Sequence, residues 1–129
     1  MADKFKTHGA FSWFELTTTD IGAAADFYGK LFGWETVDTP MGEGRPYIVV
    51  KVDDESVAGI MNTPPQAQGM PPMWSIYITV EDVDATAEKT RELGGRVLMP
   101  PIDIPRVGRF CVIQDPQGAV LCPIQYEEM

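Results

Sequence analysis

The sequence repeats itself at an offset of 62 residues, and this repeat constrains the fold more than any other feature. The aligned pairs are Asp20 with Asp82, Ile21 with Val83, Ala23 with Ala85, Ala25 with Ala87, Leu31 with Leu93, Gly33 with Gly95, Val50 with Val112 and Asp53 with Asp115. Self-similarity at one fixed spacing indicates a structural unit that is used twice. A functional position in the first copy should therefore have a counterpart in the second.

The first copy has the pattern of a strand, a helix and three more strands. Its helix should be capped by Thr19 or Asp20 and should end at Gly33, which tolerates a left-handed backbone. Apolar residues recur at helical spacing at Ile21, Ala24, Ala25, Tyr28, Leu31 and Phe32. The predicted strands are 11–17, 34–37, 47–52 and 57–61, with a Pro- and Gly-rich loop at 39–46 and a polar turn at 53–56.

The second copy has the same order of elements. Its helix follows Asp82 and ends at Gly94-Gly95, and the turn Asp115-Pro116-Gln117-Gly118 closes its last hairpin. The predicted strands are 74–80, 96–99, 109–114 and 119–125, with a loop at 100–107. We therefore predict an α+β fold, a single domain over 1–129 made of two tandem βαβββ modules. The modules span about 9–62 and 73–126, and the Pro-rich segment 63–72 links them.

Alternation along the first strand of each module separates two faces. The purely aliphatic or apolar sets are Phe14 with Leu16 and Ile76 with Ile78, and the mixed sets are Trp13, Glu15 and Thr17 with Ser75, Tyr77 and Thr79. Successive side chains of a strand point to opposite faces. We expect the first sets to pack under the helices and the mixed sets to line a cleft enclosed by the curled sheets.

Charge and composition exclude several classes of partner. A net charge of −9 with ten scattered basic residues argues against nucleic acid binding, which needs clustered Lys and Arg. No apolar run approaches the roughly 18–20 residues of a membrane span, and no secretion signal follows Met1. We therefore expect a cytoplasmic protein without a membrane partner. Two cysteines are too few for a disulfide framework.

The order of three motifs resembles the vicinal oxygen chelate superfamily, which contains glyoxalase I, bleomycin resistance proteins and extradiol dioxygenases. The motifs are Thr19-Asp20-Ile21-(x)5-Phe27-Tyr28-(x)3-Phe32-Gly33-Trp34, then Val83-(x)9-Leu93-Gly94-Gly95, then Asp115-Pro116-Gln117-Gly118. This superfamily hosts lyases, isomerases, dioxygenases, epimerases and binding proteins on one scaffold. The resemblance implies the fold and leaves the activity open.

The resemblance also implies four strand positions that bind a metal in the metalloenzymes of the superfamily. Spacing from Asp20 and Asp115, together with the repeat, places them at Trp13, Ile60, Ser75 and Cys122. Oxygen- and nitrogen-binding metals need imidazole or carboxylate at most of these positions. The one histidine, His8, precedes the first strand. We therefore predict neither a metal nor a cofactor.

The residues predicted to bind a ligand are Trp13, Glu15, Ile60, Ser75, Tyr77, Arg109 and Cys122. Trp13 and Tyr77 could hold a flat molecule in one cavity, and Arg109 could hold an anionic group or lie at the surface. No catalytic residue is identified beyond the candidate Glu15. This side chain would act as a general acid or base if it is buried, and otherwise is a solvated carboxylate at the mouth of the cleft.

Cys111 and Cys122 lie on the two strands of the last hairpin. A direct pairing would bring the thiols together as a redox or soft-metal pair. A bulge at Gly118 would shift the register by one residue and point them to different faces. We favour the second arrangement, with two inert buried thiols.

These observations favour metal-independent binding or sequestration of a small organic molecule, as in the bleomycin resistance branch. An alternative is a glyoxalase-like lyase, or an enzyme of the hydroxylase or dioxygenase type, that uses Glu15 or a metal held by unexpected ligands. A third is a pathway component whose cleft shapes a product. The resemblance also implies a homodimer, the commonest form of closed oligomer.

Overall fold

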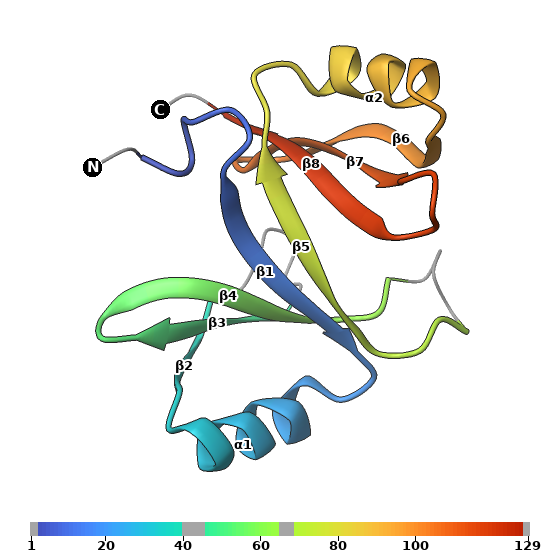
Figure 1. Cartoon of the computed structure of the whole chain (residues 1–129). Coiled ribbons are helices and arrows are strands. Elements are labelled where there is room, and N and C mark those ends of the chain that lie inside the picture. Colours follow the sequence, from blue (N-terminus) through green and yellow to red (C-terminus); the bar gives the residue numbers. More distant parts are fainter. Residues whose placement is uncertain (1–2, 40–45, 65–68, 128–129) are drawn as a thin grey trace. The chain divides into compact units, whose positions relative to one another are not determined.

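The computed structural model of the chain describes residues 3–39, 46–64 and 69–127 (Figure 1). The predicted loop 39–46 and linker 63–72 lie largely outside these residues. The elements are β1 (Phe11–Thr18), α1 (Ile21–Phe32), β2 (Glu35–Asp38), β3 (Tyr47–Val52), β4 (Glu55–Asn62), β5 (Met73–Thr79), α2 (Val83–Glu92), β6 (Arg96–Ile104), β7 (Gly108–Gln114) and β8 (Val120–Tyr126).

Two compact units make up the chain, and the division between them falls inside β1 and β5. One unit is Trp13–Ser75, and the other joins the segment up to Ser12 with the chain from Ile76 onward. Each unit contains one helix and one mixed sheet. The predicted α+β class and the doubled order of elements are therefore confirmed.

In the unit Trp13–Ser75 the strands follow the order β2-β3-β4-β1. β1 is parallel to β4, and the other neighbours are antiparallel. Figure 1 shows α1 beside this sheet. The core between helix and sheet contains Leu16, Ile48, Val50, Ala58 and Ile60, packed against Ile21, Ala24, Ala25 and Tyr28 of the helix. Leu16 thus lies under the helix, as its place in the strand pattern predicts.

Local capping sets both ends of α1. The carboxylate of Asp20 accepts a hydrogen bond from the Ala23 amide at 3.0 Å, and Gly33 ends the helix with a φ of 75°. Only the first part of the predicted apolar face is covered. Leu31 and Phe32 remain 57% and 58% exposed, because the core residues contacted by α1 lie under its first two turns.

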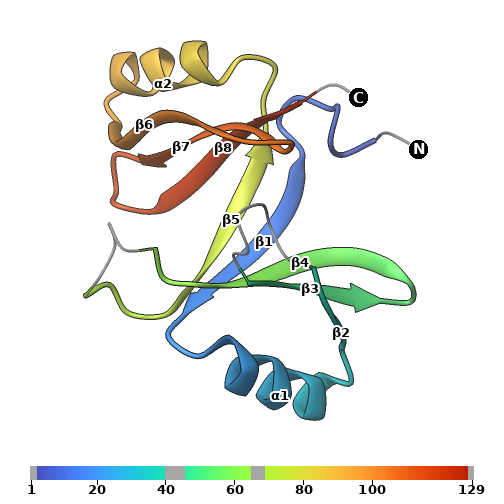
Figure 2. The same cartoon turned by 180° about the vertical axis from the view of Figure 1, so that it is seen from behind.

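In the second unit the strand order is β5-β8-β7-β6, with β5 parallel to β8 (Figure 2). Val83 and Ala87 of α2 pack on Val80 and Cys111. The N-terminal segment belongs to this unit, since the backbones of Gly9 and Thr79 are joined by a 2.7 Å hydrogen bond. Helix α2, like α1, begins at an aspartate cap and is followed by a left-handed glycine, here Gly94 with a φ of 91°.

β6 is longer than the predicted strand 96–99. It continues through Pro100 and Pro101 to Ile104, so the expectation of a loop over 100–107 is wrong for most of that segment. Proline cannot donate to a ladder, but it is tolerated at a sheet edge and at bulges. β6 is the edge strand of its sheet, and its register with β7 shifts twice, between Val97 and Met99 and between Met99 and Ile102.

These shifts change the repeat. Glu15 pairs with Gly59 across β1 and β4, and Tyr77 pairs with Cys122 across β5 and β8. Tyr77 follows Glu15 by 62 residues, but Cys122 follows Gly59 by 63. An ungapped offset is therefore wrong for the last hairpin, where bulges in β6 have displaced the frame. No helix of the described residues is long and apolar enough to cross a membrane.

Candidate functional site

A chain of hydrogen bonds lies on the sheet face of the unit Trp13–Ser75 that points away from α1. The Trp13 indole Nε1 donates to the Tyr47 hydroxyl at 3.0 Å, and that hydroxyl donates to Oε2 of Glu15 at 2.9 Å. Tyr47 is 9% exposed, while Trp13 and Glu15 are half-buried. β1 and β3 supply these side chains by alternation, because their neighbours Leu16 and Ile48 face the core under α1.

Gly59 of β4 provides the space for Tyr47. A Cβ atom at this position would lie 1.7 Å from the Tyr47 hydroxyl oxygen and 2.1 Å from Cζ of the same ring. The tyrosine ring therefore crosses the strand directly over the glycine, beside the residue that pairs with Glu15. Any larger residue would displace the ring or shift the strand.

The sequence pattern did not single out Tyr47 or Gly59. The signal for Tyr47 was its alternation with the apolar Ile48 and Val50, which places it on the face of Glu15. The close approach over Gly59 depends on the pairing of β3 with β4. No local pattern reports that contact.

The second unit has an apolar counterpart of this hydrogen-bonded chain. Tyr77 corresponds to Glu15, and its ring lies 5.9 Å from that of Phe110, centroid to centroid. Cys122, which pairs with Tyr77, is buried. The carboxylate and hydroxyl are thus confined to the first unit. Trp13 and Tyr77 belong to different units, and their sharing of one cavity stays a prediction.

Ile60 does not lie with the other predicted ligand-binding residues. It is completely buried in the core under α1, opposite Leu16. The prediction moved Cys122 back by 62 residues, whereas the last hairpin is displaced by 63. Gly59 is therefore the structural counterpart of Cys122. Ser75 is half-buried in β5, next to Trp74, whose indole nitrogen lies 3.3 Å from the Tyr28 hydroxyl.

Arg109 lies on the α2 side of its sheet, away from the face of Tyr77. Its Nε and Nη2 donate to the two oxygens of Asp84 at 3.0 Å each, and Nη1 donates to Asp103 at 3.1 Å. Hydrogen bonding to Arg109 lowers the pKa of Asp84, and the two aspartates raise the pKa of Arg109. The predicted role as an anion ligand in the cleft is therefore replaced by an exposed ion-pair cluster.

The two thiols point to opposite faces of the β7-β8 hairpin. Cys111 is fully buried in the core under α2, whereas Cys122 pairs with Tyr77 on the other face. Both cysteines are free, as predicted. Burial raises the pKa of the Cys111 thiol to about 11, so the thiolate is disfavoured at neutral pH.

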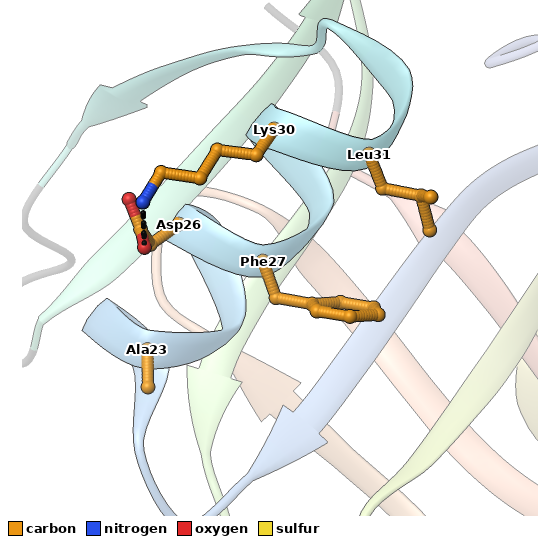
Figure 3. Close-up of a pocket in the computed structure, with 5 residues that line it drawn as sticks. All are labelled: Ala23, Asp26, Phe27, Lys30 and Leu31. Carbon is orange, nitrogen blue, oxygen red and sulfur yellow. Dashed lines mark ion pairs between the residues drawn. The ribbon is translucent and has the colours of Figure 1, made fainter.

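An open hollow lies on the outer side of α1, lined by Ala23, Asp26, Phe27, Lys30 and Leu31. Figure 3 shows Phe27 and Leu31 on one side of the helix and the ion pair between Asp26 and Lys30, at 3.0 Å, on another. Phe27 and Leu31 are 59% and 57% exposed. This surface faces away from the sheet that bears Glu15.

The four predicted metal positions do not have the chemistry of a divalent metal site. With the corrected register they carry Trp13, Gly59, Ser75 and Cys122. Indole and glycine side chains offer no metal donor, and serine is a poor one. Within the part of the chain that the structure describes, no three His, Cys, Asp or Glu side chains gather as a metal would require.

Comparison with known proteins places this geometry in a family. Residues 10–122 match the family model of the Glyoxalase/Bleomycin resistance protein/Dioxygenase superfamily. A Mycobacterium tuberculosis protein named "Putative glyoxylase CFP32" is 46% identical over 115 residues, which are 88% of this chain and 44% of that protein. The anthracycline biosynthesis protein DnrV of Streptomyces peucetius is 37% identical over 124 residues, 86% of this chain and 45% of its own. The chain thus spans less than half the length of these relatives.

Structures of known proteins show the same fold. Methylmalonyl-CoA epimerase from Mycobacterium tuberculosis has a TM-score of 0.68 at 15% identity, over 99% of this chain and 94% of that one. A Streptomyces coelicolor methylmalonyl-CoA epimerase in complex with 2-nitronate-propionyl-CoA has a TM-score of 0.65 at 20% identity, over 95% and 100%. At these identities the likeness concerns the fold alone.

Proposed function

Because this chain belongs to the Glyoxalase/Bleomycin resistance protein/Dioxygenase superfamily, we propose that it binds a small organic molecule without a catalytic metal. The proposed site is the sheet face that carries Trp13, Glu15 and Tyr47. One observation carries this proposal: a half-buried carboxylate is held in a hydrogen-bonded chain with two aromatic side chains. Ligand sites commonly combine an apolar or aromatic lining with a few fixed polar groups.

The residue types support binding without a metal. Trp13 and Gly59 stand at two of the positions where metalloenzymes of the family place ligands, and neither can coordinate an ion. Trp13 instead offers a flat apolar surface. The homologues named for glyoxylase and anthracycline chemistry make a small organic molecule the reasonable ligand class.

A thermal-shift screen of small organic molecules, with the protein treated with a chelator, tests this function. A ligand present at about 100 times its dissociation constant should stabilise the folded protein by roughly 2.7 kcal/mol. Trp13→Ala should weaken the binding of a hit by more than it lowers stability. Unchanged affinity per folded Trp13→Ala molecule would place the site elsewhere. A hit that binds only after a transition metal is restored would contradict metal independence.

The alternative function is an enzyme, and the contact between Glu15 and Tyr47 favours it. A carboxylate in hydrogen-bond contact with a phenol is suited to move a proton to or from a bound molecule. In this case Glu15→Gln would abolish turnover of the hit while leaving its binding measurable. A screen hit that is recovered chemically unchanged after prolonged incubation supports the binding function instead.

A further inference from the structure

The direction of the hydrogen bonds on the site face shows what the site can still recognise. An indole N–H only donates and an ionised carboxylate only accepts, so the chain runs from Trp13 through Tyr47 to Glu15. The indole N–H is already directed at the Tyr47 hydroxyl, and the Tyr47 hydroxyl hydrogen at Glu15. The chain therefore ends on an anion that can accept further hydrogen bonds, since the two oxygens of a carboxylate have about four acceptor positions.

Tyr47 also limits how the carboxylate can lie. The phenol ring is buried and crosses Gly59 with no room for a Cβ atom, so its hydroxyl is held by the strand pairing. A hydrogen bond of 2.9 Å from this fixed hydroxyl orients Glu15 beside the face of Trp13. Charge-assisted hydrogen bonds of this kind are stronger than neutral ones.

We propose that Tyr47 is a positioning residue for Glu15, and that together they select a flat aromatic ligand carrying a cationic N–H donor. The aromatic part would lie against Trp13, and the ammonium group would donate to Glu15. A cation near an indole face is stabilised further by the ring quadrupole, and the net charge of −9 favours the approach of cations. This inference rests on the proposed function, because it names the ligand class of the same site.

The test compares three naphthalenes that differ in one substituent: 2-(1-naphthyl)ethylamine, 1-ethylnaphthalene and 1-naphthylacetate. Calorimetry of the full chain should show the amine binding at least tenfold more tightly than the neutral compound, with the carboxylate binding most weakly. Glu15→Gln should abolish the preference for the amine. Tyr47→Phe keeps the ring and removes the hydroxyl, so it should reduce the preference severalfold while the neutral compound binds as before.

Two further variants separate positioning from general loss of structure. Gly59→Ala should reduce the amine preference as Tyr47→Phe does, because the added Cβ displaces the hydroxyl. Glu35→Gln is the matched control, since it removes the same charge from an exposed position on β2 and should leave the preference unchanged. A loss of preference in Glu35→Gln equal to that in Glu15→Gln would reduce the effect to net charge and overturn the inference.

The outcomes distinguish this inference from the function on which it rests. Equal affinities of wild-type protein for all three naphthalenes, all weakened by Trp13→Ala, would leave the proposed function standing and overturn the cation preference. A preference that persists in Tyr47→Phe would remove the positioning role of Tyr47. Absence of binding by every naphthalene would count against the proposed function and this inference together.

Discussion

Single residues in equivalent positions of the two units have acquired different roles. Glu15 and Tyr47 form a polar pair, whereas Tyr77 and Phe110 form an apolar one. The difference is one of side-chain chemistry on a common strand pairing. A duplicated frame therefore does not imply a duplicated site, and the polar chemistry is concentrated in the unit Trp13–Ser75.

The ion pair of Asp84 with Arg109 predicts a pH effect on stability. Because the pKa of Asp84 is lowered by hydrogen bonding to Arg109, this carboxylate stabilises the fold above its unfolded pKa near 3.8, and the contribution is lost as the pH falls through the lower folded value. Asp84→Asn should lower the melting temperature at pH 7 and have little effect at pH 2. Carbon-13 NMR should show Asp84 titrating below 3.8. A carboxyl that titrates above that value would contradict the pairing.

The buried cysteines predict a simple thiol count. Neither Cys111 nor Cys122 should react quickly with 5,5′-dithiobis(2-nitrobenzoate) at pH 8, because both are buried and the pKa of Cys111 is raised to about 11. Two thiols should react once guanidinium unfolds the chain. Since unfolding returns the Cys111 pKa toward 9.0, stability should also decrease as the pH rises from 9 toward 11. Zero reactive thiols in guanidinium would instead indicate a disulfide.

At the scale of elements, the two helices are built by the same local rules. Each begins at an aspartate whose carboxylate accepts from the amide three residues later, Asp20 from Ala23 and Asp82 from Ala85. Such caps satisfy backbone donors that the helix itself leaves unpaired. The helices differ at their ends, where the left-handed residue is Gly33 in one and Gly94 in the other.

Removing either cap should have a similar effect. Asp20→Ala and Asp82→Ala should each lower the free energy of unfolding by about 1 kcal/mol, because each leaves a helical amide without its acceptor. Urea denaturation measures this change. Asp20→Asn and Asp82→Asn are the matched controls and should retain most of the stability, since asparagine caps about as well. A loss confined to one helix would show that the second cap is redundant in its own unit.

At the scale of the molecule, the outer face of α1 predicts self-association. We propose that a second copy covers the exposed Phe27 and Leu31, since apolar patches of this kind mark interaction surfaces. Pairing two α1 helices antiparallel about a two-fold axis would set Asp26 of one copy against Lys30 of the other. The face is thus complementary to itself in charge as well as apolar.

Light scattering should therefore find a homodimer at micromolar concentration. Added salt should strengthen it, because two chains of net charge −9 repel each other. Leu31→Glu should give a monomer. Leu98→Glu makes the same change at an exposed position of β6 and should leave the dimer intact. A wild-type monomer, or equal effects of the two variants, would contradict the proposed contact.

The sequence by itself determined the elements, their order, the helix caps and the face that carries Trp13 and Glu15. These features depend on local hydrogen bonding and on the alternation of side chains, both of which are written in short stretches of residues. Only the tertiary structure decided which residues meet across strands. The bulges of β6 displaced the last hairpin by one residue, moved Ile60 into the core and made Gly59 the partner position. Tyr47 joined the site because a glycine on a neighbouring strand leaves room for its ring, and such pairings depend on the register between segments distant in sequence.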